Sequence, residues 1–207
     1  GRGAGGAGEL PVEPVALDAG AFTYALTEGT AALPLWTTPP TRKTSAADRA
    51  PAGEARSGLA LSAARHEFEP VELVLGPASG RVTAEVAAFP ELGAGQRVEL
   101  AVAGYELGRE ETLTPLASGA SVTLDPGQGT PLWLTVYVPD GAPAGEHETT
   151  LTLTPEGGEP LAVPVTLTVF DFTLPAEIHF HSQLNLSVGD LAGGSVDAQK
   201  TLLFEHR

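Results

Sequence analysis

The chain of 207 residues has no cysteine and no methionine, and only 6% of its residues are aromatic. Without cysteine there is no disulfide framework, no thiolate chemistry and no zinc ribbon. No run of about 18 apolar residues occurs, so the sequence predicts no membrane-spanning helix. Eleven basic residues stand against 26 acidic ones, a formal net charge of −15. Nucleic-acid binding needs a basic surface, so this balance excludes it.

The first residues carry little patterning. Residues 1–10 begin with Gly and Ala around a single Arg, which predicts a flexible leader. The chain opens with Gly1 and not with Met, so we expect either that an N-terminal segment has been removed or that the chain is a fragment, with any export signal already gone. A chain without cysteine also tolerates an oxidising compartment.

Charge is distributed unevenly along the chain. Residues 1–60 carry five basic and six acidic side chains, whereas residues 61–207 carry six and twenty. Residues 37–58 are rich in Pro, Gly and Ala and hold four of the eleven basic side chains. Strand-like segments flank this stretch, so it is predicted to be an ordered crossing loop.

Alternation of apolar and polar residues dominates the middle of the chain. In residues 131–139 both alternating faces carry bulk, which is typical of a strand covered on two sides. Residues 146–154 combine an apolar face with a Thr-rich face, as in a half-buried strand. Pro164, within residues 161–169, indicates an edge strand or a bulge. Further strands are expected at residues 15–17, 22–26, 59–63, 68–75, 82–89, 98–107 and 121–124.

Helical periodicity is nearly absent before residue 190. Many short strands with turn signals every 8–12 residues or so are typical of an antiparallel sandwich. The predicted fold class is therefore all-β, an immunoglobulin- or fibronectin-like antiparallel β-sandwich over residues 11–175. One helix is expected at residues 196–206, after a Gly-Gly-Ser sequence.

Paired carboxylates are the first candidates for chemistry. Glu67 and Glu69 share one face of a predicted strand, and Glu110 and Glu111 are expected in a loop. A glycosidase needs two carboxylates about 5–9.5 Å apart. The surrounding sequence does not mark either pair as catalytic, so Glu67 and Glu69 are expected to pair with Arg65 or to be solvated.

His179 and His181 form an H-x-H pattern that can present two imidazoles to one metal ion. A third ligand would have to come from a distant residue such as His147, Asp190 or His206. Surface or domain-contact histidines are the favoured interpretation, and the sequence predicts no cofactor.

Trp36 and Trp133 are candidates for glycan contact, because sugar rings stack on aromatic faces. Trp36 precedes Thr-Thr-Pro-Pro and is expected to be half-exposed. Trp133 is expected in the core or beneath a following domain.

Three blocks of sequence carry a family resemblance. Residues 33–75 place a Trp near a Thr/Pro run and then read ARHEFEP, residues 130–153 begin TPLWLTVYVPDGAPAGEH, and residues 163–175 read VPVTLTVFDFTLP. In this order the blocks resemble the β-sandwich that precedes the barrel in a group of bacterial glycoside-hydrolase-like proteins. That group is labelled domain of unknown function 4091 and is related to glycoside hydrolase family 123.

The chain departs from this family pattern at three positions. His66, Glu72 and His147 stand where the family usually has Asn, Gln and Tyr. The resemblance implies that residues 176–207 begin a truncated TIM-like barrel, a (β/α) barrel. It also implies a catalytic Asp-Glu pair, used with the substrate's own acetamido group, in the later part of that barrel. No adjacent Asp-Glu occurs in this chain, so no catalytic residue is predicted.

The resemblance therefore implies a non-catalytic accessory β-sandwich of a secreted, cell-surface or periplasmic bacterial protein. It would brace a catalytic barrel and contact glycan, and its partner would be the remainder of the parent polypeptide or another protein chain. The parent protein could be a glycoside hydrolase, whereas the chain alone is not expected to catalyse. Two alternatives stay open: a building block of an extracellular assembly or filament, which includes a homo-oligomer, and a stand-alone carbohydrate-binding module.

Overall fold

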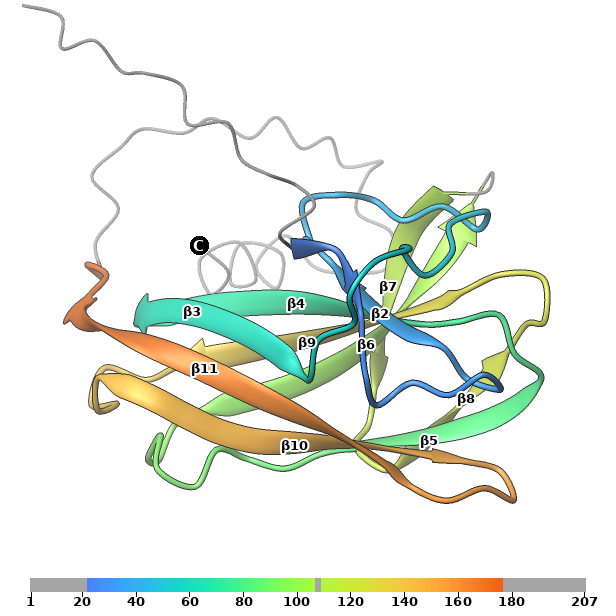
Figure 1. Cartoon of the computed structure of the whole chain (residues 1–207). Coiled ribbons are helices and arrows are strands. Elements are labelled where there is room, and N and C mark those ends of the chain that lie inside the picture. The colour runs from blue at the N-terminus through green and yellow to red at the C-terminus, as the bar shows by residue number, and fades with distance from the viewer. Residues whose placement is uncertain (1–21, 107–108, 177–207) are drawn as a thin grey trace, which may run out of the picture.

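A computed structural model describes residues 22–106 and 109–176, apart from the side chains of residues 109–111. In these residues two β-sheets pack face to face (Figure 1). The strands are β1 (Tyr24–Ala25), β2 (Leu35–Thr38), β3 (Leu59–Arg65), β4 (Glu67–Leu75), β5 (Gly80–Val86), β6 (Arg97–Glu106), β7 (Arg109–Leu116), β8 (Ala120–Leu124), β9 (Thr130–Val138), β10 (Gly145–Pro155) and β11 (Leu161–Thr173).

One sheet has six strands in the order β1-β2-β4-β9-β6-β7, and the other has five in the order β3-β11-β10-β5-β8. Neighbouring strands pair antiparallel except β3 and β11, which are parallel. The all-β sandwich predicted from the sequence is confirmed. Several expected elements lie outside the described residues: the leader at residues 1–10, the strand at 15–17 and the helix at 196–206. Of the expected barrel residues 176–207, only Ala176 is described.

The core lies between the inward faces of the two sheets. In β9, Leu132, Leu134, Val136 and Val138 are at most 1% exposed, while the residues between them are half-buried. The inward faces of β10 and β11 contribute buried Leu and Val side chains in the same way. The period-2 pattern of these strands therefore records which face enters the core.

Proline inside the strands needs a separate explanation. The expectation that Pro164 marks an edge strand or a bulge is wrong, because β11 lies inside its sheet between β10 and β3. Pro164 pairs with Thr150 of β10, and pairing with β3 begins only at Val165. Pro70 of β4 and Pro131 of β9 also lie just beyond the last pair with a neighbouring strand. Proline has no N–H to donate to a ladder. Each of these three prolines stands where its strand is paired with only one of its two neighbouring strands, so no donor is needed on the other side.

The sequence did not predict β2 or β7. The two residues Thr37 and Thr38, expected at the start of the crossing loop, belong to β2. Residues 39–58 then pass from β2 in the six-stranded sheet to β3 in the five-stranded sheet, as the crossing interpretation requires. Glu110 and Glu111, expected in a loop, belong to β7, an edge strand that pairs with β6.

Candidate functional site: the outer face of the six-stranded sheet

The two outward faces of the sandwich differ in chemistry. On the five-stranded sheet, the exposed rings of Phe170 and Phe172 stack at the end of β11, and the outward positions of β10 and β11 before them include Thr150, Thr152, Thr166 and Thr168. A threonine face of this kind is suited to water. On the six-stranded sheet, the outward positions carry aromatic, proline and alanine side chains instead, so this face requires an explanation.

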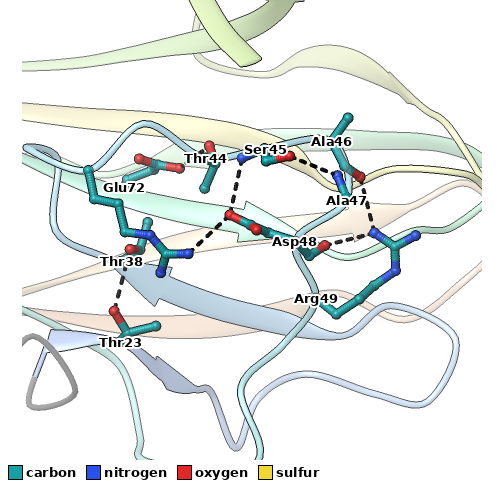
Figure 2. Close-up of polar contacts among 10 residues, drawn as sticks. Thr23, Thr38, Thr44, Ser45, Ala46, Ala47, Asp48, Arg49 and Glu72 are labelled. Atoms are coloured by element: carbon teal, nitrogen blue, oxygen red, sulfur yellow. Dashed lines mark hydrogen bonds and ion pairs between the residues drawn. The ribbon is translucent and has the colours of Figure 1, made fainter. Parts of the chain in front are cut away.

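The crossing loop covers one part of this face. Thr44 of the loop is buried, and its Oγ1 donates a hydrogen bond of 2.8 Å to Oε1 of Glu72, which is 0% exposed (Figure 2). The loop is held in shape by Asp48, whose carboxylate accepts from Arg42 Nη2 at 3.3 Å and from the Ser45 amide at 3.1 Å. The loop lies over Glu72 and is held in shape by its own hydrogen bonds. It therefore protects the Glu72 carboxylate from water.

Trp36 lies on the same outward face, on β2. Its side chain is 2% exposed, so the expectation of a half-exposed indole available to glycan is wrong. In the register of the sheet Trp36 is paired with Val74, which is also fully buried. The crossing loop leads away from the end of β2, and the indole remains packed against the sheet. In this structure Trp36 offers no face to a sugar.

The remainder of the face forms a groove of about 1120 Å³, which we call the outer groove. It is lined by Phe68, Pro70, Val86, Val98, Glu99, Leu100, Ala101, Leu113, Pro115, Leu116, Ala117, Ser118, Trp133 and Thr135. Trp133 is half-buried here and is not a core residue, while Leu113 of the edge strand is 52% exposed. The groove reaches Val86 of β5 and therefore extends to the edge between the two sheets.

An aromatic cluster lies at one end of the outer groove. The guanidinium of Arg97 lies 4.7 Å from the ring centre of Phe68 and 4.9 Å from that of Tyr137. The two rings contact each other at 4.7 Å, and the His66 ring meets Tyr137 edge-on at 6.1 Å. The sequence pattern did not indicate this cluster. The alternation of side chains along β4 and β9 places Phe68 and Tyr137 on the outward face, and this pattern could have indicated the cluster.

The exit of β11 lies beside this aromatic cluster. Leu174 donates its amide to Arg65 O at 3.0 Å, and its carbonyl oxygen lies 3.2 Å from His66 Nδ1. Arg65 also donates to Ala142 O and to Asp171 Oδ1, at 2.7 and 2.9 Å. The chain therefore leaves the sandwich at the same end as the aromatic part of the outer groove.

The expected pairing of Glu67 and Glu69 with Arg65 is wrong, since Arg65 bonds elsewhere. Oε2 of Glu67 accepts from the Ala64 amide at 2.7 Å and so stabilises the turn between β3 and β4. Glu69 is half-buried and lines a different pocket. Burial, and secondarily the charge of Glu67, raise the pKa of Glu69 to about 7.

Of the histidines considered as metal ligands, the described residues include only His147. It is 5% exposed, and its Nε2 lies 2.9 Å from the carbonyl oxygen of Pro143. His179, His181, Asp190 and His206 lie outside the described residues. Within residues 22–106 and 109–176 no three His, Asp or Glu side chains are grouped so that they could hold a metal ion. The same residues contain no helix long and apolar enough to cross a membrane.

Comparison with known proteins gives structural neighbours but no family. No family model matches the sequence, and no curated protein matches it. A family 123 glycoside hydrolase from Clostridium perfringens aligns with a TM-score of 0.43 and 12% identity, over 59% of this chain and 24% of that chain. The N-terminal domain of PorA aligns with a TM-score of 0.34 and 15% identity, over 56% and 90%. A GH5 xyloglucanase from Bacteroides ovatus aligns with a TM-score of 0.33 and 11% identity, over 64% and 21%.

Two of these three neighbours are glycoside hydrolases, and the chain spans about a quarter or less of the length of each. Likenesses at these TM-scores and identities do not carry an argument about function.

Proposed function

We propose that this chain is a non-catalytic accessory β-sandwich of a secreted glycoside-hydrolase-like protein, and that its outer groove packs against a following (β/α) barrel. The observation that carries the proposal is the apolar lining of the outer groove on a face that points away from the core. Large apolar hollows on protein surfaces are typical of interaction sites. Away from the exposed rings of Phe170 and Phe172, the outward face of β10 and β11 is rich in threonine and suited to water.

Leu113 and Trp133 are the anchors of the proposed contact. Leu113 lies on the edge strand with half of its side chain exposed, and Trp133 lies in the floor of the groove. A partner that covered them would remove apolar surface from water, at about 25 cal/mol per Å². Aromatic and aliphatic anchors of this kind commonly dominate the stability of an interface.

The chain exit supports a partner in the same polypeptide. Leu174 is held beside His66 and Arg65, next to the aromatic end of the outer groove. A domain that began shortly after Ala176 would therefore start at the surface it is proposed to cover. The block at residues 163–175 resembles the exit strand of the bacterial family, which supports the same order of domains.

The test uses the protein from its producing organism. We expect an intact mass larger than that of the 207 residues, because a barrel adds about 250 residues. In that longer protein, Leu113→Asp should lower the midpoint of thermal unfolding and expose the barrel junction to proteolysis. Thr123→Asp, on the exposed face of β8, is the matched control and should change neither. A native mass equal to the 207 residues, or equal effects of the two variants, would overturn the proposal.

Trp133 favours carbohydrate binding as a second candidate function. Its half-buried ring shares the outer groove with Glu99 and Thr135, so an apolar ring surface lies beside polar oxygen atoms. A glycan array probed with the chain should then show binding that Trp133→Ala abolishes and Thr123→Ala leaves unchanged. Binding that persists in Trp133→Ala would exclude the groove as the glycan site. A stable higher oligomer in a sizing experiment would instead favour an assembly of like chains.

A further inference from the structure

A second, smaller pocket opens between the two sheets on the side of β1 and β3. Its volume is about 380 Å³, within the range of about 300–1,000 Å³ typical of small-ligand sites. We call it the edge pocket, and it is lined by Phe22, Tyr24, Thr37, Thr38, Pro39, Pro40, Arg56, Ala60, Ser62, Glu69, Pro70 and Val71. It shares only Pro70 with the lining of the outer groove, so the two sites can be tested separately.

Glu69 is the unexplained group in the edge pocket. Its carboxyl is half-buried, yet within the described residues it makes no hydrogen bond and no ion pair. Glu67, two residues earlier on the same strand, is satisfied by the Ala64 amide. A desolvated carboxyl without a protein partner is costly to the fold. Such a group in a pocket is a candidate for ligand binding.

The other lining groups have complementary chemistry. The guanidinium of Arg56 lies 4.9 Å from the ring centre of Tyr24. The Tyr24 hydroxyl donates to Gly58 O at 3.2 Å, so this ring is fixed in place. The Ser62 side chain is exposed at the rim, and the Phe22 ring is 58% exposed. The pocket thus combines an acceptor, a cationic donor, a hydroxyl group and an aromatic surface.

We infer that the edge pocket binds a neutral polyhydroxylated ring, a single sugar residue, with two neighbouring hydroxyls donating to the Glu69 carboxylate. Arg56 would donate to a ring or hydroxyl oxygen, and the apolar face of the sugar would lie on Phe22. An anionic ligand would meet the Glu69 carboxylate, and a cationic ligand would meet Arg56. A neutral ligand with donors and acceptors on one edge avoids both conflicts.

Binding should depend on pH through Glu69. The charged and titratable groups around it are Glu67 on the same strand, Arg56 before β3, and Tyr24 on β1. The ionised carboxylate accepts two hydroxyl hydrogen bonds, and hydrogen bonds to a charged acceptor are about twice as strong as neutral ones. Sugar binding is therefore expected to be tighter at pH 8.5 than at pH 5.5, values about 1.5 units either side of a pKa of about 7.

The experiment is ligand-observed saturation-transfer NMR on the 207-residue chain, with the methyl glycosides of common neutral and N-acetylated monosaccharides as probes. We expect at least one probe to bind, and Glu69→Gln to weaken it about tenfold and remove its pH dependence. Phe22→Ala should weaken it as well. Leu113→Ser, in the outer groove, should leave binding unchanged.

Two outcomes would overturn the inference. One is that no probe shows saturation transfer at either pH. The other is that binding survives Glu69→Gln but is lost in Trp133→Ala, which would place the sugar in the outer groove. A cooperative thermal unfolding transition in each of the Glu69→Gln and Leu113→Ser variants shows that both are folded. The result does not depend on the existence of a barrel partner, so it can fail or succeed independently of the proposed accessory function.

Discussion

Gly129 lies against Trp36 with no room for a side chain of its own. A β-carbon built on Gly129 would lie 2.9 Å from Trp36 Cη2 and 2.8 Å from Val74 Cγ1. Gly129 immediately precedes β9, whereas Trp36 and Val74 pair across β2 and β4. Three segments distant in sequence therefore meet at one contact, and this contact fixes the buried position of the indole.

Gly129→Ala is expected to destabilise the fold by about 1–3 kcal/mol, because the added methyl group forces the indole or Val74 to move. The matched control is Gly141→Ala, where a β-carbon would meet nothing within 4 Å. Urea denaturation followed by tryptophan fluorescence measures both. Equal unfolding midpoints for the two variants would show that the Trp36 contact is not tight.

His66 has a φ of 64°, a left-handed backbone conformation that asparagine and histidine tolerate better than most residues. His66→Val should destabilise the fold by about 1–3 kcal/mol more than His66→Asn, since β-branched residues are strained there. Both variants lose the ring contact with Tyr137, so the difference between their free energies of unfolding measures the backbone strain. Chemical denaturation of the two proteins gives that difference, and a value near zero contradicts the strain argument.

Thr44→Val removes the hydroxyl that donates to the fully buried carboxylate of Glu72. The expected cost is about 1–3 kcal/mol, because a buried acceptor loses one hydrogen bond. The variant should also increase proteolysis within the crossing loop. Thr123→Val, at an exposed position of β8, is the control and should have little effect on the free energy of unfolding.

The stability of the fold should depend on pH through Glu69. Its pKa is raised from 4.5 to about 7 in the folded chain, so the folded state holds a proton that the unfolded state has released. The wild type should therefore lose stability relative to Glu69→Gln as the pH rises from about 4.5 through about 7. Unfolding curves at pH 4.5 and pH 8.5 measure this effect, with Glu148→Gln on the exposed face of β10 as control. A constant difference between wild type and Glu69→Gln at both pH values would contradict it.

Strands with one face in the core could be predicted from sequence. The alternation in residues 131–139, 146–154 and 161–169 corresponds to β9, β10 and β11, because an inward face must be apolar at every second residue. The edge strand β7 was missed. It begins with three charged residues, and an edge can carry such residues because only one of its sides pairs.

Site residues were harder to predict than strands. Trp133 was expected in the core or beneath another domain, and it lines a groove on the outward face. Trp36 was expected to be half-exposed and is buried, because Gly129, which is distant in sequence, lies against its ring. Glu69 was considered only as one of a carboxylate pair that was expected to bond Arg65 or to be solvated. Its unusual environment arises only where β1, β3 and β4 enclose the edge pocket.

The sequence by itself determined the all-β class, the central strands and the sign of the surface charge, since these follow from composition and period-2 alternation along the chain. The tertiary structure alone decided which outward face is covered, that β3 joins β11 in parallel, and that Glu69 is desolvated. The reason is physical. Alternation is a local property of one strand, whereas the covering of a face depends on contacts between segments that lie far apart in sequence.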